Sequence, residues 1–188
     1  MAWTTRSTRT TYENRWISVR EDEVTGPAGD GIYGVVEMRH PAVFVVAVDE
    51  QDRVCFVEVD RYTTGRSLEV PAGGTDGEEP LVAAKRELLE ETGLVAASWE
   101  AIGRMNALNG IAVAPEHVFL ARGLAEAEDA ASSQREEGIE RVVWIPFAEA
   151  VRQVAEGRID DGETVAALDD GETVAALAYA GISLGRFV

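Results

Sequence analysis

The sequence predicts an α/β fold in which a mixed β-sheet is covered by helices. Three observations support this prediction. Apolar, strand-like runs alternate with turn residues through the first half of the chain; the apolar period changes to that of a helix at Pro80; and strand-like runs followed by a helical run return in the second half. Strands on both sides of a helix, with a further helix near the end, are typical of such layered folds.

The predicted strands of the first half are rich in Val, Ile and aromatic residues. Residues 16–24 and 32–40 flank a segment of Gly, Pro and Asp, which favours a turn. Residues 42–48 and 53–62 follow as a hairpin-like pair around the polar segment 49–52. The run 42–48 has no polar alternation, and this predicts a strand buried on both faces.

A helix is predicted immediately after these strands. Leu81, Ala84 and Leu88 recur at helical spacing and form one apolar stripe. Pro80 suits the first turn of this helix, because its missing N–H would have no partner there. Gly93 suits the position just past the end.

The last third of the chain contains two further predicted strands and a helix, over residues 117–124, 140–145 and 146–157. The nonapeptide DDGETVAAL then occurs at 160–168 and again, without change, at 169–177. Nine residues advance a helix by about 900°, which is half a turn out of phase, so one continuous helix cannot present the same face twice. We interpret the repeat as a tandem duplication with a break near residues 169–171, with a sequencing artefact as the alternative.

The charge of the chain excludes some classes of partner. Its 188 residues contain 17 Lys and Arg against 34 Asp and Glu, for a net charge of −17. Duplex nucleic acid and anionic membranes both require a basic surface, so neither is an expected partner. The length favours one domain with extensions. A single cysteine, Cys55, and the absence of an apolar signal segment or long apolar run predict a cytoplasmic protein.

The predicted helix carries a cluster of acidic residues. Glu87, Glu90 and Glu91 are spaced by three and four residues, so all three share one side of the helix. Carboxylate oxygens in such a cluster suit Mg²⁺ or Mn²⁺, which then contact phosphate oxygens. Arg86 lies four residues before Glu90 and can fix a carboxylate by ion pairing. Taken alone, the run could also be a solvated helical face.

The wider spacing around this cluster is that of a known motif. The residues that match it are Glu78, Arg86, Glu87, Leu88, Glu90, Glu91, Gly93 and Leu94. Ala72 occupies the place of the first glycine of the motif, and Gly73 lies one residue too close to Glu78. The pattern resembles the Nudix box. The segments YENRWISVRED, GIYGVVE and LEVPAGG extend the likeness, over residues 12–168, to the ADP-ribose pyrophosphatase-like branch of the Nudix hydrolase superfamily.

This resemblance implies a specific architecture. The fold would be a Nudix-type α/β/α sandwich with a mixed central sheet, preceded by N-terminal antiparallel strands. Residues 1–40 would form the N-terminal strand region, used for dimerisation and base contact. Residues 41–188 would form the Nudix hydrolase domain, with the duplicated nonapeptide at 160–177. Members of this branch are typically homodimers.

The resemblance also assigns roles to individual residues. Glu87, Glu90, Glu91 and the carbonyl of Ala72 would hold Mg²⁺ or Mn²⁺, with Arg86 beside them. The remaining implied roles fall on residues outside the box: substrate binding on Trp16, Tyr33, Arg61 and Glu69, and general base on Glu137, with Glu136 as its neighbour. Packing or surface roles remain open for these residues.

The implied reaction is metal-dependent hydrolysis of a nucleoside diphosphate-sugar, with ADP-ribose split into AMP and ribose 5-phosphate as the best single candidate. Hydrolysis of another nucleotide sugar or nucleoside diphosphate derivative is a second possibility. A non-catalytic sensor of nucleotide sugars is a third. The intact acid cluster and the absence of room for a DNA-binding module disfavour the sensor.

Overall fold

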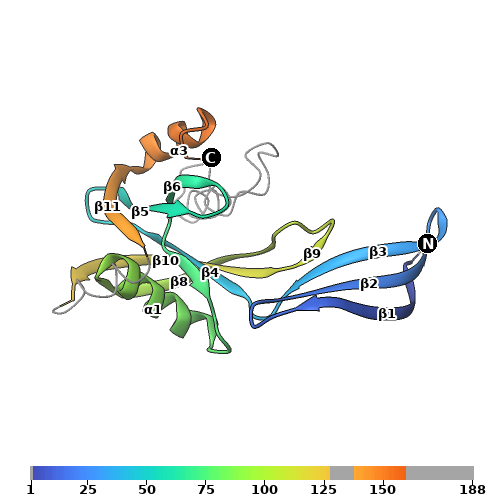
Figure 1. The fold of residues 1–188 in the computed structure, drawn as a ribbon. Coiled ribbons are helices and arrows are strands. Elements are labelled where there is room, and N and C mark those ends of the chain that lie inside the picture. The colour runs from blue at the N-terminus through green and yellow to red at the C-terminus, as the bar shows by residue number, and fades with distance from the viewer. Residues whose placement is uncertain (1, 128–137, 160–188) are drawn as a thin grey trace.

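A computed structural model describes residues 2–127 and 138–159 of the chain (Figure 1). Its elements, in chain order, are β1 (Thr4–Glu13), β2 (Ile17–Gly26), β3 (Gly29–Met38), β4 (Ala42–Ala47), β5 (Arg53–Arg61), β6 (Gly65–Glu69), β7 (Ala72–Gly74), α1 (Pro80–Thr92), β8 (Leu94–Asn106), β9 (Ala112–Val113), β10 (Pro115–Glu126), β11 (Ile139–Pro146) and α3 (Phe147–Ala155). In this part of the chain, no helix is long and apolar enough to cross a membrane.

The strands form three sheets. One sheet has the order β7-β4-β10-β8 and is mixed, because β4 and β10 run parallel while the outer pairs are antiparallel. A second sheet, β11-β5-β6, is antiparallel. The third sheet contains the N-terminal strands in the order β1-β2-β3-β9.

Helices α1 and α3 cover opposite sides of the two central sheets (Figure 1). On the α3 side, apolar residues of β4, β5 and β10 pack with Phe147, Ala150 and Val154 of the helix. On the α1 side, the alternate residues of the same strands pack with Ala84 and Leu88. The strands are therefore buried on both faces, and the predicted α/β/α sandwich with mixed sheet pairing is confirmed.

Strand β4 shows the predicted burial on both faces, since Val43 to Val48 are all buried. Its predicted hairpin with β5 is wrong. The two strands share only one bridge, between Val48 and Val54, and then enter different sheets. Residues of both strands nevertheless contribute to both core clusters. Cys55 lies in that core, and burial raises the pKa of its thiol to about 12, as expected for an unreactive, structural cysteine.

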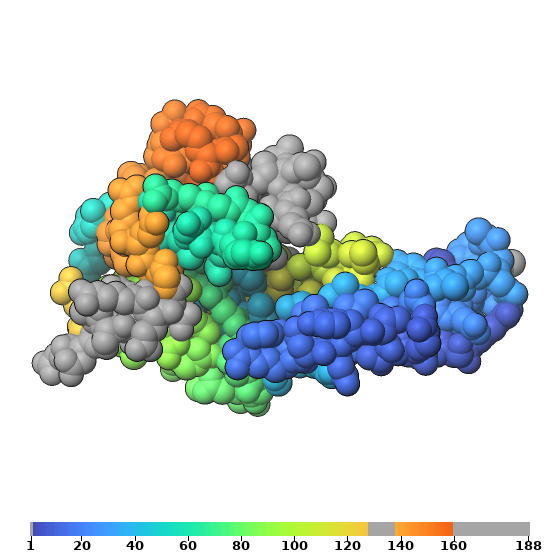
Figure 2. Space-filling view, in the orientation of Figure 1, coloured from blue at the N-terminus to red at the C-terminus, as the bar shows by residue number. Residues whose placement is uncertain are grey.

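The N-terminal sheet extends from the body as an arm (Figures 1 and 2). Every residue of β1 is exposed, and β2 contributes few buried side chains. Strand β1 was not predicted, because a Thr- and Arg-rich segment with both faces in solvent has no apolar alternation. Strand β8 was also missed, because its alanines and its single Trp give no clear period.

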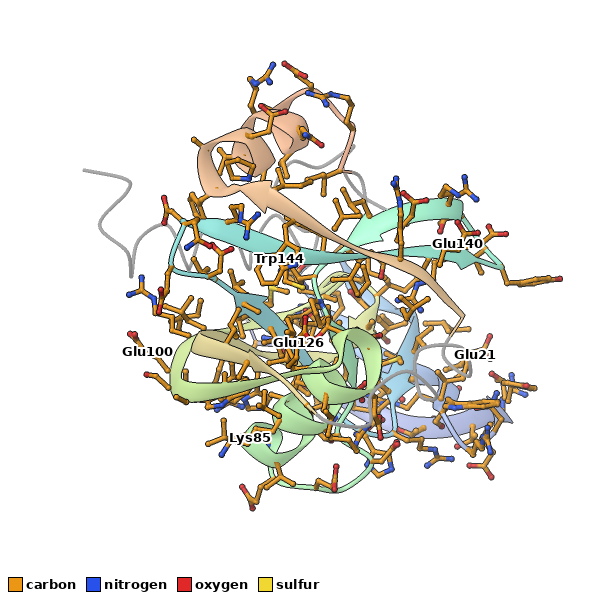
Figure 3. The ribbon with its side chains drawn as sticks, turned by 90° about the vertical axis from the view of Figure 1, so that its left-hand side faces the viewer. Glu21, Lys85, Glu100, Glu126, Glu140 and Trp144 are labelled. Atoms are coloured by element: carbon orange, nitrogen blue, oxygen red, sulfur yellow. The ribbon has the colours of Figure 1, made fainter. Side chains whose placement is uncertain are left out.

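Helix α1 begins at Pro80 and ends at Thr92, with Gly93 just past its end, as predicted. Its inward face differs slightly from the predicted stripe, because Leu81 is 37% exposed and Ala83 is buried in its stead. Opposite this face, Lys85 points away from the body (Figure 3), whereas Trp144 of β11 is partly buried against the core on the α1 side. The rotated face carries Glu87 and Glu91 inward with the apolar residues.

Gly93 closes α1 in a left-handed conformation with φ 75°, and its N–H donates to the carbonyl of Leu89. Because a Cβ is disfavoured there, we expect Gly93→Ala to lower the free energy of unfolding by about 1–2 kcal/mol. Urea denaturation measures this loss, and the exposed helical substitution Lys85→Ala is the matched control. Equal stability of the two variants would contradict the assignment of the cap.

The tandem nonapeptide at 160–177, its predicted break at 169–171 and the predicted base Glu137 all lie outside the described residues. These remain predictions.

Candidate active site

The acidic helix α1 and the short strand β7 face each other across the centre of the site. Glu87 and Glu91 are only 7% and 6% exposed. The backbone N–H of Ala72 donates to a carboxylate oxygen of Glu91 at 3.0 Å. A Cβ added to Gly73 would lie 2.3 Å from the Glu87 carboxyl group. Only glycine at this position lets β7 approach the helix so closely.

Arg86 links the acidic residues to the loop before the helix. Its guanidinium donates to Glu78 at 3.0 Å, to Glu87 at 2.7 Å and to Glu90 at 3.0 Å. A fourth hydrogen bond reaches the carbonyl of Gly74 at 2.9 Å. The predicted pairing of Arg86 with Glu90 is therefore present, and one arginine neutralises much of the charge that the cluster accumulates.

Glu91 is the acid whose hydrogen bond comes from the backbone of β7 and not from Arg86. Burial raises its pKa to about 8, the hydrogen bond from Ala72 acts in the opposite direction, and the negative charge of Glu87 raises the pKa further. A buried carboxyl group of this kind is stable when protonated or when a cation lies beside it. Acids whose pKa is raised in this way are enriched at functional sites.

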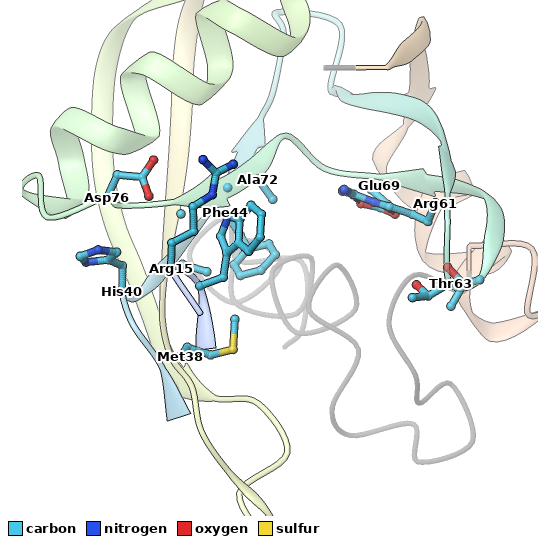
Figure 4. Close-up of a pocket in the computed structure, with 14 residues that line it drawn as sticks. Arg15, Met38, His40, Phe44, Arg61, Thr63, Glu69, Ala72 and Asp76 are labelled. Atoms are coloured by element: carbon cyan, nitrogen blue, oxygen red, sulfur yellow. Dashed lines mark hydrogen bonds and ion pairs between the residues drawn. The ribbon is translucent and has the colours of Figure 1, made fainter. Parts of the chain in front are cut away.

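A cavity of about 450 Å³ opens beside β7 (Figure 4). It brings together four residues that the sequence had assigned to the site: Trp16, Arg61, Glu69 and Ala72. They come from the β1–β2 turn, the end of β5, the end of β6 and the start of β7, respectively. Residues separated by more than 50 positions in the sequence thus meet at one cavity beside the acidic helix.

Arg61 and Glu69 form a paired unit on the wall of this cavity. The Arg61 guanidinium donates to both carboxylate oxygens of Glu69, at 3.1 and 2.5 Å. The arrangement is bidentate, which is the strong geometry for an arginine–carboxylate pair. Both residues had been predicted to bind substrate, and in this structure each holds the other in place.

Tyr33 does not line the cavity. It lies on the N-terminal arm, where its hydroxyl donates to the carbonyl of Gly110 and its ring packs edge-on against Trp3, with centroids 5.6 Å apart. Within one chain, therefore, the structure places Trp16 at the candidate site and leaves Tyr33 away from it.

Several residues that line the cavity had not been predicted. These are Arg15, Met38, His40, Ala42, Phe44, Thr63, Thr64, Gly73, Gly74 and Asp76. Most belong to turns or strand ends, whose approach to the site depends on how the arm meets the body. The position of Arg15 directly before the predicted Trp16 was the one signal in the sequence that could have pointed to it.

The donor atoms at this site fit a hard divalent cation, because carboxylate and carbonyl oxygens are its preferred ligands. Buried Glu91, with its raised pKa, and Glu87, packed against the glycine backbone of β7, supply two such donors. In the described ranges, no three acidic, His or Cys side chains converge on one point. The reason is visible in the contacts, since Glu87 and Glu90 are turned toward Arg86.

The fold and the acidic helix beside a cavity give the geometry of the candidate site, and the comparisons with known proteins give the family. The NUDIX domain model matches residues 38–168, and that of the nucleoside diphosphate sugar hydrolase N-terminal domain matches residues 3–36. The chain belongs to the Nudix family and is a Nudix pyrophosphohydrolase.

Individual relatives agree with this placement. The chain is 34% identical, over 167 residues, to an ADP-ribose pyrophosphatase of Mycobacterium tuberculosis, covering 87% of this chain and 80% of that protein. It is 33% identical over 104 residues to a GDP-mannose pyrophosphatase of Yersinia enterocolitica, covering 55% and 54%. A crystal structure of an ADP compounds hydrolase has the same fold, with a TM-score of 0.79, 19% identity and coverage of 99% and 96%.

Proposed function

We propose that this enzyme hydrolyses a nucleoside diphosphate-sugar with the help of Mg²⁺ or Mn²⁺, and that ADP-ribose, split into AMP and ribose 5-phosphate, is its main substrate. The observation that carries the proposal is the position of the cavity. It is lined by Ala72 and Gly73 of β7, and of these Ala72 bonds Glu91 and Gly73 lies next to Glu87. The likeness to an ADP-ribose pyrophosphatase along most of both chains supports this substrate.

A second candidate substrate is another nucleotide sugar. The shorter likeness to a GDP-mannose pyrophosphatase favours this alternative, since it shows that similar sequences are found in enzymes named for a different base and sugar. Both candidates share the diphosphate, and the same acidic helix would serve either one.

In the proposed mechanism the protein acts chiefly by positioning. Trp16 offers an aromatic face to the base, and the Arg61–Glu69 pair holds the wall against which the nucleotide lies. Water adds to one phosphorus, the bridging P–O bond breaks, and each product leaves as a phosphate monoester. Glu137 is the candidate that accepts the proton of the water. Fixed geometry and charge stabilisation supply most of the rate in such reactions.

Glu87, Glu90, Glu91 and the Ala72 carbonyl would hold the divalent cation. When bound, it neutralises the diphosphate and lowers the pKa of the attacking water. Arg86 has a separate role, because it keeps Glu87 and Glu90 side by side before any cation arrives. Its positive charge offsets a mutual repulsion that would otherwise destabilise the helix.

The experiment that tests this function is a product analysis. The purified protein is incubated with Mg²⁺ or Mn²⁺ and a panel that contains ADP-ribose, GDP-mannose and other nucleotide sugars, and the products are separated by chromatography. AMP together with ribose 5-phosphate, formed faster than any other product pair, is the expected result. A folded protein that cleaves no diphosphate in the panel would refute the proposal.

We also propose that the enzyme is a homodimer joined through the N-terminal region, residues 1–40. The arm has little core of its own and exposes large apolar side chains, among them Trp3, Ile32 and Ile111. A second copy of the chain could cover such side chains. We expect sedimentation velocity to show a dimer, and Ile32→Glu, at a side chain that is 71% exposed, to shift it toward monomer without unfolding. A wild-type protein that is monomeric at every concentration would contradict this.

A further inference from the structure

The turn between β1 and β2 is held in one conformation by a dense set of hydrogen bonds. The side-chain oxygen of Asn14 accepts from the backbone N–H groups of Trp16 and Ile17, both at 2.8 Å. The N–H of Asn14 donates to the carbonyl of Ile17 at 2.9 Å, and the N–H of Arg39 donates to that of Trp16 at 2.8 Å. An Asn that bonds its own turn in this way fixes the backbone of the residues that follow. Arg15 and Trp16 are therefore presented together.

Arg15 places a positive charge inside the cavity. Its guanidinium carbon lies 4.0 Å from the centroid of the Trp16 ring, a distance at which the ring face attracts a cation. Both residues line the cavity. Figure 4 shows the Arg15 side chain reaching toward β7, with its guanidinium between Asp76 and Ala72. Next to that strand lie Glu87 and Glu91, the acids assigned to the cation.

The two arginines of the cavity differ in how their charge is used. Arg61 is held by the bidentate contact with Glu69, so much of its charge is already neutralised. Among the described residues, Arg15 makes no ion pair with a carboxylate. Its guanidinium stacks on the Trp16 ring instead. Asp76 is the other acidic residue of the wall. Arg15 is thus the cavity arginine whose charge no carboxylate of the described residues neutralises.

We propose that Arg15 is a substrate-binding residue whose guanidinium, stacked on the Trp16 ring, contacts the diphosphate of the nucleotide through its N–H groups. This inference rests on the proposed function. A planar group with five donors matches phosphate oxygens well and is only weakly hydrated. Since Arg15 and Trp16 share one turn, the same segment of the chain would bind both the base and the diphosphate.

The test compares two ligands that differ only in the diphosphate. Binding of ADP and of adenosine is measured by calorimetry in the presence of Mg²⁺ for wild type, Arg15→Gln and Arg15→Lys. If wild type hydrolyses GDP-mannose faster than ADP-ribose, GDP and guanosine replace this pair. Arg9→Gln is the matched control, because Arg9 is an exposed arginine of β1 and its loss changes the net charge equally.

We expect Arg15→Gln to weaken diphosphate binding about tenfold or more while nucleoside binding stays within about twofold of wild type, as for a lost charge-assisted hydrogen bond. Arg15→Lys should regain part of the loss, and Arg9→Gln should match wild type for both ligands. Equal weakening of both ligands would mean that Arg15 only supports Trp16, and it would overturn the proposal, as would no change. Wild-type hydrolysis in the product analysis keeps either failure distinct from failure of the proposed function, which would appear as no turnover.

Discussion

Glu91→Gln should abolish most of the activity and at the same time make the cation-free protein more stable at alkaline pH. The substitution keeps the shape of the side chain and an oxygen that can accept the hydrogen bond from Ala72. It removes the charge that the proposed mechanism needs next to the cation. Loss of one preorganised electrostatic group costs about 10²–10³-fold in turnover, and we expect kcat to fall by at least that factor.

The stability effect follows from the raised pKa of Glu91, about 8 in the folded chain, where burial is the main cause. In the unfolded chain this group has the ordinary pKa of a glutamate, near 4.3. Between these values the folded state retains a proton that the unfolded state has lost, so the stability of the wild type falls as pH rises through this window. Glutamine at this position cannot ionise, so this loss is absent in the variant.

Thermal unfolding in a chelator measures this difference. The melting temperature of Glu91→Gln minus that of wild type should increase from pH 5 to pH 8. Adding Mg²⁺ should then stabilise the wild type more than the variant, because binding to the folded state adds to its stability. Glu126→Gln, which changes an exposed carboxylate of β10, is the control and should show neither effect. If the wild type were as stable as the variant at pH 8 in chelator, the pKa of Glu91 would not be raised by folding.

Gly73→Ala should lower activity far more than stability. The added Cβ would lie 2.3 Å from the Glu87 carboxyl group, which is closer than real atoms approach. The carboxyl group is the end of a flexible side chain and can move aside, but doing so disturbs its ion pair with Arg86. We expect a loss of about 1–2 kcal/mol in the free energy of unfolding. Because the displaced group is a proposed cation ligand, the loss in kcat/KM should reach about 100-fold.

The control for this variant is Gly34→Ala. Gly34 lies in the exposed strand β3, and an added Cβ there would meet no atom within 4 Å. Its substitution should leave both stability and activity close to wild type. Denaturant unfolding and steady-state kinetics on the same preparations give the comparison. Full activity in Gly73→Ala would mean that the close approach of β7 to the acidic helix has no part in the reaction.

The acidic helix could be predicted from the sequence because its signals are local. Pro80 and Gly93 mark its ends, and Glu87 and Glu91 are related by the helical repeat alone. The depth to which these two acids are buried could not be predicted, because it depends on the strand β7 that folds over them. The pairing of Arg61 with Glu69 was not predicted for a similar reason, because it depends on how strands β5 and β6 pair.

The parts of the fold that escaped prediction are those whose signal is not local. The apolar composition of strand β4 predicts its burial, but no residue in the turn after it predicts that β5 pairs in another sheet. Strand β1 has no apolar face from which a strand could be predicted. Arg15 belongs to the cavity only because the arm meets the body at that turn. A contact between the arm and the body joins residues far apart in the sequence, so the spacing of residues within a short segment cannot predict it.

The four hydrogen bonds of Arg86 bear on how the loop before the helix tolerates changes in length. Arg86 reaches Gly74 at one end of that loop and Glu78 at the other, so both ends are fastened to the helix by one side chain. Between them, Asp76 and Gly77 adopt positive φ angles of 50° and 88°, which turn the chain tightly. The loop can therefore lose a residue, as the displaced glycine of the motif indicates, without moving the acids. Insertions and deletions between these two anchor points should accumulate among related sequences more readily than at any position within the helix.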